Sequence, residues 1–116
     1  MTGNVTEISM DTVDSKGRKF YPVFYFMTDK LGLSKTELLV FALIYSFFNH
    51  SREYTGTREN ICKRVNAKRS AVDDALRNLL NKGYITKRKV HKRGYIAVAY
   101  TVNEEVVDKL VVPAAK

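Results

Sequence analysis

The chain has 116 residues, 45% of them hydrophobic, and its 20 Lys and Arg against 12 Asp and Glu give a formal charge of +8. A chain of this length can bury one hydrophobic core but not two, and this composition excludes a disordered basic tail. The single cysteine, Cys62, excludes an internal disulfide and a zinc site built from several cysteines, and it favours a reducing compartment. We therefore expect one folded domain.

The sequence carries no recognisable targeting or membrane-spanning segment. No apolar stretch follows Met1, and the longest apolar run, residues 38–45, is far shorter than the roughly 18 residues that cross a bilayer. We therefore expect a cytoplasmic protein with no membrane partner.

The positive charge is concentrated in one part of the chain. Residues 63–93 carry a net charge of +9, whereas the other 85 residues sum to −1. Like charges gathered in one segment repel one another unless a polyanion or counterions compensate them. A solvated helix surface also carries lysines and arginines, but this concentration favours a surface that binds a polyanion.

The N-terminal quarter divides into a polar and an aromatic segment. Residues 1–19 are polar without sustained periodicity, and we expect them to form a flexible or peripheral arm. Residues 20–26 place six bulky apolar side chains around a proline, which predicts an extended segment. The folded domain is expected over residues 20–112, with residues 113–116 as a frayed end.

A first helix is predicted over residues 35–49. Ser34 and Glu37 have the spacing of a capping box, in which each side chain satisfies a free backbone donor. Residues 38–45 are apolar on every side of the helix, so more than one face must be covered. The cover is the aromatic segment, a homodimer partner contacting residues 20–48, or both.

A short strand is predicted at residues 53–56, and two further helices follow it. Thr57 is a suitable N-cap for a helix over residues 58–65, and a tight turn at Asn66 and Ala67 follows it.

The third helix is predicted from residue 68 or 69 to residue 82, with Gly83 as its stop. Its apolar side chains recur at helical spacing: Val72, Ala75, Leu76, Leu79 and Leu80.

The last part of the chain predicts a basic hairpin and a short helix. Residues 84–90 and 95–102 are typical of two strands, joined by a four-residue loop at residues 91–94 with Val90 opposite Tyr95. The outer half of this hairpin is too charged to enter a core and is expected to project into solvent. A short helix is expected from Asn103 toward Leu110.

This order of elements resembles the winged helix-turn-helix domain, an α+β fold with a three-helix core and a β-hairpin wing. The resemblance covers about residues 34–102 and is carried by the helix-to-wing junction, Leu79-Leu80-Asn81-Lys82-Gly83-Tyr84-Ile85. Residues 24–27 and 31–46 are similar, more narrowly, to the N-terminal domains of plasmid and phage replication initiators and replisome organisers. These resemblances imply a module for transcription regulation or DNA replication that binds operator or origin DNA and often dimerises.

The candidate DNA-binding residues lie on the second helix, the third helix and the wing. Arg69 and Arg77 are expected to read guanine, because a guanidinium can donate two hydrogen bonds to the O6 and N7 edge. The full set expected to contact groove or phosphate is Thr57, Arg58, Lys68, Arg69, Ser70, Arg77, Lys87, Arg88, Lys89, Lys92 and Arg93.

Asp73 and Asp74 are the exception on the third helix, because two carboxylates repel phosphate. Either one of them accepts a hydrogen bond from a cytosine amino group, or it turns inward and holds a neighbouring arginine.

No other chemistry is indicated. The sequence has no phosphate-binding loop, nucleophile elbow or paired-carboxylate motif, so we expect no catalytic residue, cofactor or small-molecule ligand. Two distant histidines, His50 at a helix end and His91 in the wing loop, give no metal-ligand spacing.

The sequence thus predicts double-stranded DNA binding through residues 68–82 and the wing at residues 84–102. The alternative is a protein-interaction module that uses the apolar first helix and the aromatic segment. RNA binding through the wing is a third hypothesis.

Overall fold

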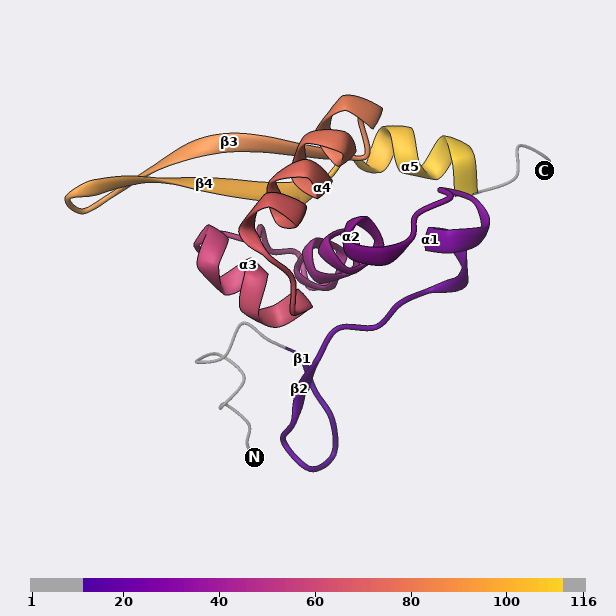
Figure 1. Cartoon of the computed structure of the whole chain (residues 1–116), viewed down its shortest axis with the longest axis horizontal. Helices are drawn as coiled ribbons and strands as arrows, with labels where there is room; N and C mark the ends of the chain where they lie inside the picture. The colour runs from indigo at the N-terminus through magenta and orange to yellow at the C-terminus, as the bar shows by residue number, and fades with distance from the viewer. Residues whose placement is uncertain (1–11, 112–116) are drawn as a thin grey trace.

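The computed structural model describes residues 12–111 of the chain (Figure 1). A small N-terminal hairpin leads into a group of helices, from which a long second hairpin projects. The elements are β1 (Thr12–Val13), β2 (Lys19–Phe20), α1 (Tyr25–Asp29), α2 (Lys35–Phe48), α3 (Arg58–Val65), α4 (Arg69–Lys82), β3 (Ile85–Lys92), β4 (Tyr95–Val102) and α5 (Glu104–Val111).

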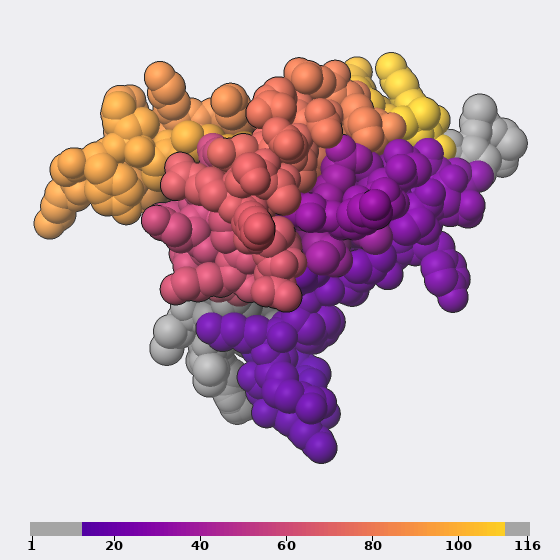
Figure 2. Space-filling view, in the orientation of Figure 1, coloured from indigo at the N-terminus to yellow at the C-terminus, as the bar shows by residue number. Residues whose placement is uncertain are grey.

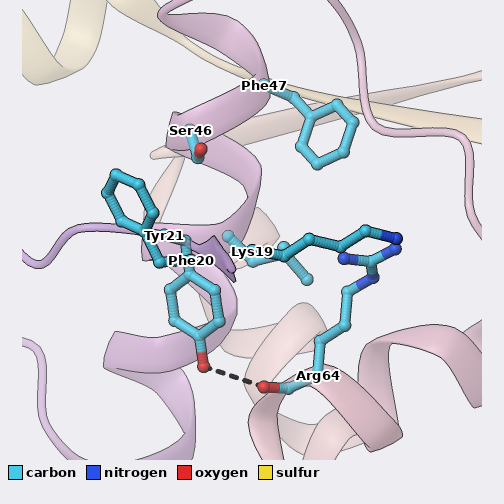
Figure 3. A pocket seen from close by; sticks show the side chains of 7 residues that line it. Lys19, Phe20, Tyr21, Ser46, Phe47 and Arg64 are labelled. Carbon is cyan, nitrogen blue, oxygen red and sulfur yellow. Dashed lines mark hydrogen bonds between the residues drawn. The ribbon is translucent and has the colours of Figure 1, made fainter. Parts of the chain in front are cut away.

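Part of the segment predicted as an arm is a hairpin in the structure, while residues 1–11 lie outside the described residues. The Asp14 carboxylate accepts hydrogen bonds from the backbone N–H groups of Lys16 and Arg18, each at 2.9 Å, and closes the turn between β1 and β2. Just after β2, the Tyr21 hydroxyl donates to the carbonyl of Arg64 at 3.0 Å (Figure 3). This bond ties the hairpin to α3 beside a small hollow of about 170 Å³.

The extended aromatic segment is shorter than predicted, because α1 begins at Tyr25. Pro22 does not oppose this helix, since it lies outside the helix and three residues before it. Helix α1 buries Met27 completely and packs the adjacent Phe26 against the core. In an extended chain these two neighbouring side chains would point to opposite faces, so only one of them could reach the core. Packing therefore outweighs the local preference of the aromatic residues for extended structure.

The central helix α2 is covered by the chain itself. Residues Val40 to Ile44 are all buried, and α2 contacts α1, α3, α4 and β4. The apolar middle of the helix therefore needs no second subunit to cover it within the described structure.

The capping box predicted at the start of α2 is wrong. Ser34 precedes the helix, but its side chain makes no capping hydrogen bond, and Lys35 has a φ of 55°. Glu37 instead accepts a hydrogen bond from Nζ of Lys82 at 2.7 Å, so it links α2 to the end of α4.

Helices α3 and α4 begin and end where the sequence predicted. The Thr57 hydroxyl accepts from the N–H of Asn60 at 3.1 Å and caps α3, and Asn66 has the left-handed φ of 53° that its turn requires. Helix α4 ends at Gly83, whose φ of 80° favours glycine. Its apolar side chains Val72, Ala75, Leu76 and Leu79 are buried against the rest of the core.

The wing is a longer hairpin than predicted. Strands β3 and β4 pair Lys92 with Tyr95 and Ile85 with Val102, so only Arg93 and Gly94 form the loop. The predicted register was therefore wrong by two residues. A shift of two keeps every side chain on its predicted face, because successive side chains alternate between faces.

At the base of the wing, the other edge of β4 forms a single bridge to the short segment before α3. Tyr54 and Tyr100 exchange two backbone hydrogen bonds of 2.8 Å each. Helix α5 follows β4 and buries Val107. The α2–α3–α4 core and the β3–β4 hairpin make this α+β structure a winged helix-turn-helix domain.

Candidate nucleic-acid interface

The predicted contact residues lie on three neighbouring parts of the fold: the start of α3, helix α4 with the residue before it, and the wing. Figure 2 shows the wing extending beyond the body of the molecule, next to α4. A single surface therefore includes both the recognition helix and the hairpin, as DNA binding by a winged helix requires.

Six of the predicted cations on this surface are exposed and have no ion pair with any described carboxylate. Two lie at the start of α4 and four on the wing, and we call these six residues the open cations: Lys68, Arg69, Lys87, Lys89, Lys92 and Arg93. Because no carboxylate neutralises them, their charge is available to a polyanion.

Arg58 has a different environment from the open cations. It is half-buried at the start of α3, and its guanidinium forms an ion pair with Asp73 of α4. Its second terminal nitrogen lies 3.4 Å from the Tyr100 hydroxyl of β4, a long hydrogen bond. Arg58 thus joins the two helices and the wing at one point.

Two more predicted contacts are also paired. Nη1 of Arg77 lies 2.9 Å from Oδ1 of Asp74, one turn earlier on α4. Arg88 donates two hydrogen bonds to the Glu53 carboxylate, at 2.9 and 2.6 Å, and thereby joins the wing to the segment before α3. These hydrogen bonds hold the pKa of Glu53 below its usual value, against the opposing effect of partial burial.

These pairs explain the two carboxylates of the recognition helix. Asp73 is half-buried and holds Arg58, which is one of the two arrangements expected for these carboxylates, whereas Asp74 holds Arg77 at the exposed surface of α4. Ser70 and Thr57 are both exposed, although the Thr57 hydroxyl already accepts the capping hydrogen bond.

A groove between the wing and the starts of α3 and α4 was not predicted. It has a volume of about 260 Å³ and is lined by Arg58, Arg69, the segment at residues 55–57, and residues 95–98 of β4. Two large apolar side chains at its outer end are exposed, Tyr95 by 63% and Ile96 by 56%. One feature of the sequence could have indicated this groove: the second strand of the hairpin is apolar over residues 95–100, although the first strand is basic.

A second surface lies away from the open cations, where α1, the end of α2 and α5 meet. Val23, Phe24 and Tyr25 are exposed there, Tyr25 by 91%, beside a hollow of about 410 Å³ lined by aromatic side chains. We call this the aromatic surface; its hollow is lined by Phe24, Phe26, Tyr45, Phe48, Asn49, Val102, Glu104, Val107 and Asp108. Burial raises the pKa of Tyr45, and the nearby carboxylates of Asp108 and Glu104 raise it further.

The two histidines and the cysteine belong to different parts of the fold. His50 lies just beyond α2 and its Nδ1 is 2.9 Å from the Ser46 carbonyl, while His91 belongs to β3 and not to the loop where it was predicted. Cys62 is half-buried. Residues 12–111 contain no metal-binding cluster of such side chains, and none of their helices has the length and apolar character to span a bilayer.

We call the surface of α4 and the wing that carries the open cations the basic surface. The fold and this basic surface define the class of protein as a winged helix-turn-helix protein. The sequence pattern of the DnaD N-terminal domain matches residues 23–115, most of the chain, so the chain belongs to that family. This confirms the predicted resemblance to the N-terminal domains of replication initiators and replisome organisers.

The fold is similar to that of a solved structure. It is described as a possible transcriptional regulator from Methanosarcina mazei Go1 and is 20% identical, with a TM-score of 0.50. The match covers 89% of this chain and 87% of that chain. No curated protein sequence matches significantly. The family supports a DNA-related role, and the neighbour supports the fold.

Proposed function

We propose that the chain binds double-stranded DNA through α4 and the wing, as a transcriptional regulator or as the DNA-binding part of a plasmid or phage replication initiator. The observation that carries this proposal is the set of six open cations, two at the start of α4 and four on the adjacent wing. An α-helix fits the major groove, and an adjacent basic hairpin can follow the phosphate backbone beside it.

The open cations and the ion-paired arginines have different roles in this proposal. Arg69 is exposed at the start of α4, where side chains of a recognition helix reach base edges, so it is the best candidate for guanine readout. The open cations of the wing supply phosphate contacts, which fix position without reading sequence. Arg58 serves mainly as a positioning residue, while Arg77 and Arg88 must exchange a carboxylate for a phosphate before they contribute.

A salt series tests the proposal. If about five phosphates are neutralised, the logarithm of the affinity falls against the logarithm of the salt concentration with a slope of about −4 to −5. Fluorescence anisotropy on a labelled DNA duplex gives this slope, with an RNA duplex of the same sequence as comparison. Absence of DNA binding at low salt would overturn the proposal, and stronger binding to the RNA would replace DNA with RNA as the ligand.

A second candidate function has its own observation. The aromatic surface exposes Val23, Phe24 and Tyr25 together, beside a hollow lined by aromatic rings. Neighbouring exposed apolar side chains of this size mark sites of protein association. We propose that this surface, within residues 20–48 and α5, mediates homodimerisation and would place two wings on one DNA molecule.

A further inference from the structure

Strand β4 has one edge that is paired only near the base of the wing. On its first edge, β4 pairs with β3 along its whole length, from Tyr95 to Val102. On its second edge, the backbone of Tyr100 bonds to Tyr54, and beyond this bridge the chain turns away through Gly56 into α3. No described strand pairs with this second edge between Tyr95 and Val98.

The hydrogen-bonding direction of this edge follows from the bridge. Both the N–H and the C=O of Tyr100 point toward Tyr54, away from β3. Backbone groups alternate in direction along an antiparallel strand, and the pairing with β3 is continuous, so Val98 and Ile96 direct their N–H and C=O groups the same way. These two residues present two donors and two acceptors to the groove of about 260 Å³ described above.

The lining of the groove adds apolar and positive character to this open edge. Ile61, Ile96 and Val98 provide apolar side chains, and no carboxylate lines the groove. Its two charged lining residues are arginines, of which Arg58 is compensated by Asp73 whereas Arg69 is one of the open cations.

We propose that this groove is a docking site for an extended, acidic segment of a partner protein, which adds a short strand to the second edge of β4. The main chain of the segment would bond to Ile96 and Val98, alternate apolar side chains would pack beside Ile61, and a carboxylate would pair with Arg69. Strand addition of this kind draws affinity from main-chain hydrogen bonds and specificity from the side-chain pockets.

A nucleic acid fits this groove less well. A phosphate backbone offers only acceptors, so it would leave the C=O groups of Ile96 and Val98 without a donor, whereas a peptide strand supplies both donors and acceptors. The apolar side chains of the groove also suit a peptide better than a charged backbone. The proposal does not depend on DNA binding. If both functions hold, the shared use of Arg69 makes peptide and DNA compete for the chain.

The test is a selection of random displayed peptides of about twelve residues on the full chain, without nucleic acid. Peptides retained by the wild type are counter-selected on Ile96→Pro, which removes one groove-facing N–H but no hydrogen bond of the β3 ladder. The matched control is Ile96→Val, which keeps the N–H and a β-branched side chain. A synthetic peptide of the enriched sequence is then titrated against each variant.

We expect acidic peptides with alternating apolar residues, bound about tenfold more weakly by Ile96→Pro and within about twofold by Ile96→Val, as loss of one well-made hydrogen bond implies. Arg69→Glu should weaken binding by a similar factor. In the wild type, the peptide should slow amide hydrogen exchange at Ile96 and Val98, which decides the question even if Ile96→Pro fails to fold.

Three results would overturn the proposal. One is that no peptide is enriched, and another is that enriched peptides bind Ile96→Pro as tightly as the wild type. The third is that a DNA duplex, and no peptide, slows exchange at Ile96 and Val98, in which case the groove is part of the DNA site. A failed salt series would reject DNA binding and would leave this peptide result standing.

Discussion

The basic surface and the aromatic surface differ in how their characteristic side chains are used. Among the predicted contact residues, Arg58, Arg77 and Arg88 each hold a carboxylate, and the six open cations are left for a ligand. On the aromatic surface, most rings pack against one another, and Tyr25 is the main one that does not. In both regions, the raw count of charged or aromatic residues overstates what is available for binding.

The largest effect is expected from neutralising the wing. Replacing Lys87, Lys89 and Lys92 together with alanine removes three open cations, so the salt slope should become shallower by about 2.7 and the affinity should fall roughly 100-fold near 0.1 M salt. Binding measurements over a salt series on cognate and random duplexes check this, and both sequences should lose equally.

A matched control for the wing triple variant replaces Lys16, Lys30 and Lys109, which are exposed elsewhere on the molecule. It removes the same formal charge and should change the slope by much less. Equal losses in the two triple variants would mean that net charge, and not the wing, governs binding.

The next effect concerns sequence readout by the recognition helix. Arg69→Ala should reduce the preference for a selected site over random DNA by about tenfold, the loss of one bidentate base contact. Arg77→Ala should cost less, because Asp74 already holds that guanidinium. Dissociation constants on both duplexes give the ratio, and equal losses on both for Arg69→Ala would refute its readout role.

The aromatic surface is tested by a charge at its most exposed ring. Tyr25→Asp should leave the fold intact, since Tyr25 is 91% exposed, but it should convert a dimer into a monomer by burying an unpaired carboxylate. Light scattering at high protein concentration measures the mass. Thr28→Asp, which adds the same charge at a nearby exposed position of α1, is the control. A monomeric wild type would remove the prediction.

The smallest effect is a pH dependence at the base of the wing. The hydrogen bonds from Arg88 lower the pKa of Glu53 from 4.5, so the pair contributes stability above pH 4.5 and loses it as the pH falls through the lower folded-state pKa. The Glu53 carboxyl resonance should titrate below pH 4.5 in the wild type and near it in Arg88→Ala. The same midpoint in both would show that the pair does not form in solution.

The sequence was sufficient for the helix-turn-helix elements because their signals are local. Thr57, Asn66 and Gly83 act through their own backbone or the next turn, and the apolar spacing of α4 belongs to one helix. The fold class follows from these signals. Three features escaped prediction because they depend on residues far apart or on packing.

The pairs Arg58–Asp73 and Glu53–Arg88 join residues 15 and 35 positions apart, so no periodicity reveals them. The wing register was missed because a slip of two residues satisfies the same alternation of faces. Helix α1 was missed because burial of Met27 decides its conformation, and that burial depends on the position of α2. The candidate site was therefore predicted as a surface, but not as a division between paired and open cations.

The single bridge between Tyr54 and Tyr100 anchors the wing at one end, and the rest of the hairpin extends from it without pairing to any other described strand. The hairpin is three strands wide only at that residue pair and two strands wide outward to Arg93 and Gly94. Load applied at the tip by a bound ligand is therefore resisted at the base, where the Glu53–Arg88 pair acts as a brace. Lengthening or shortening the hairpin by one residue pair would change its reach without disturbing the anchored end.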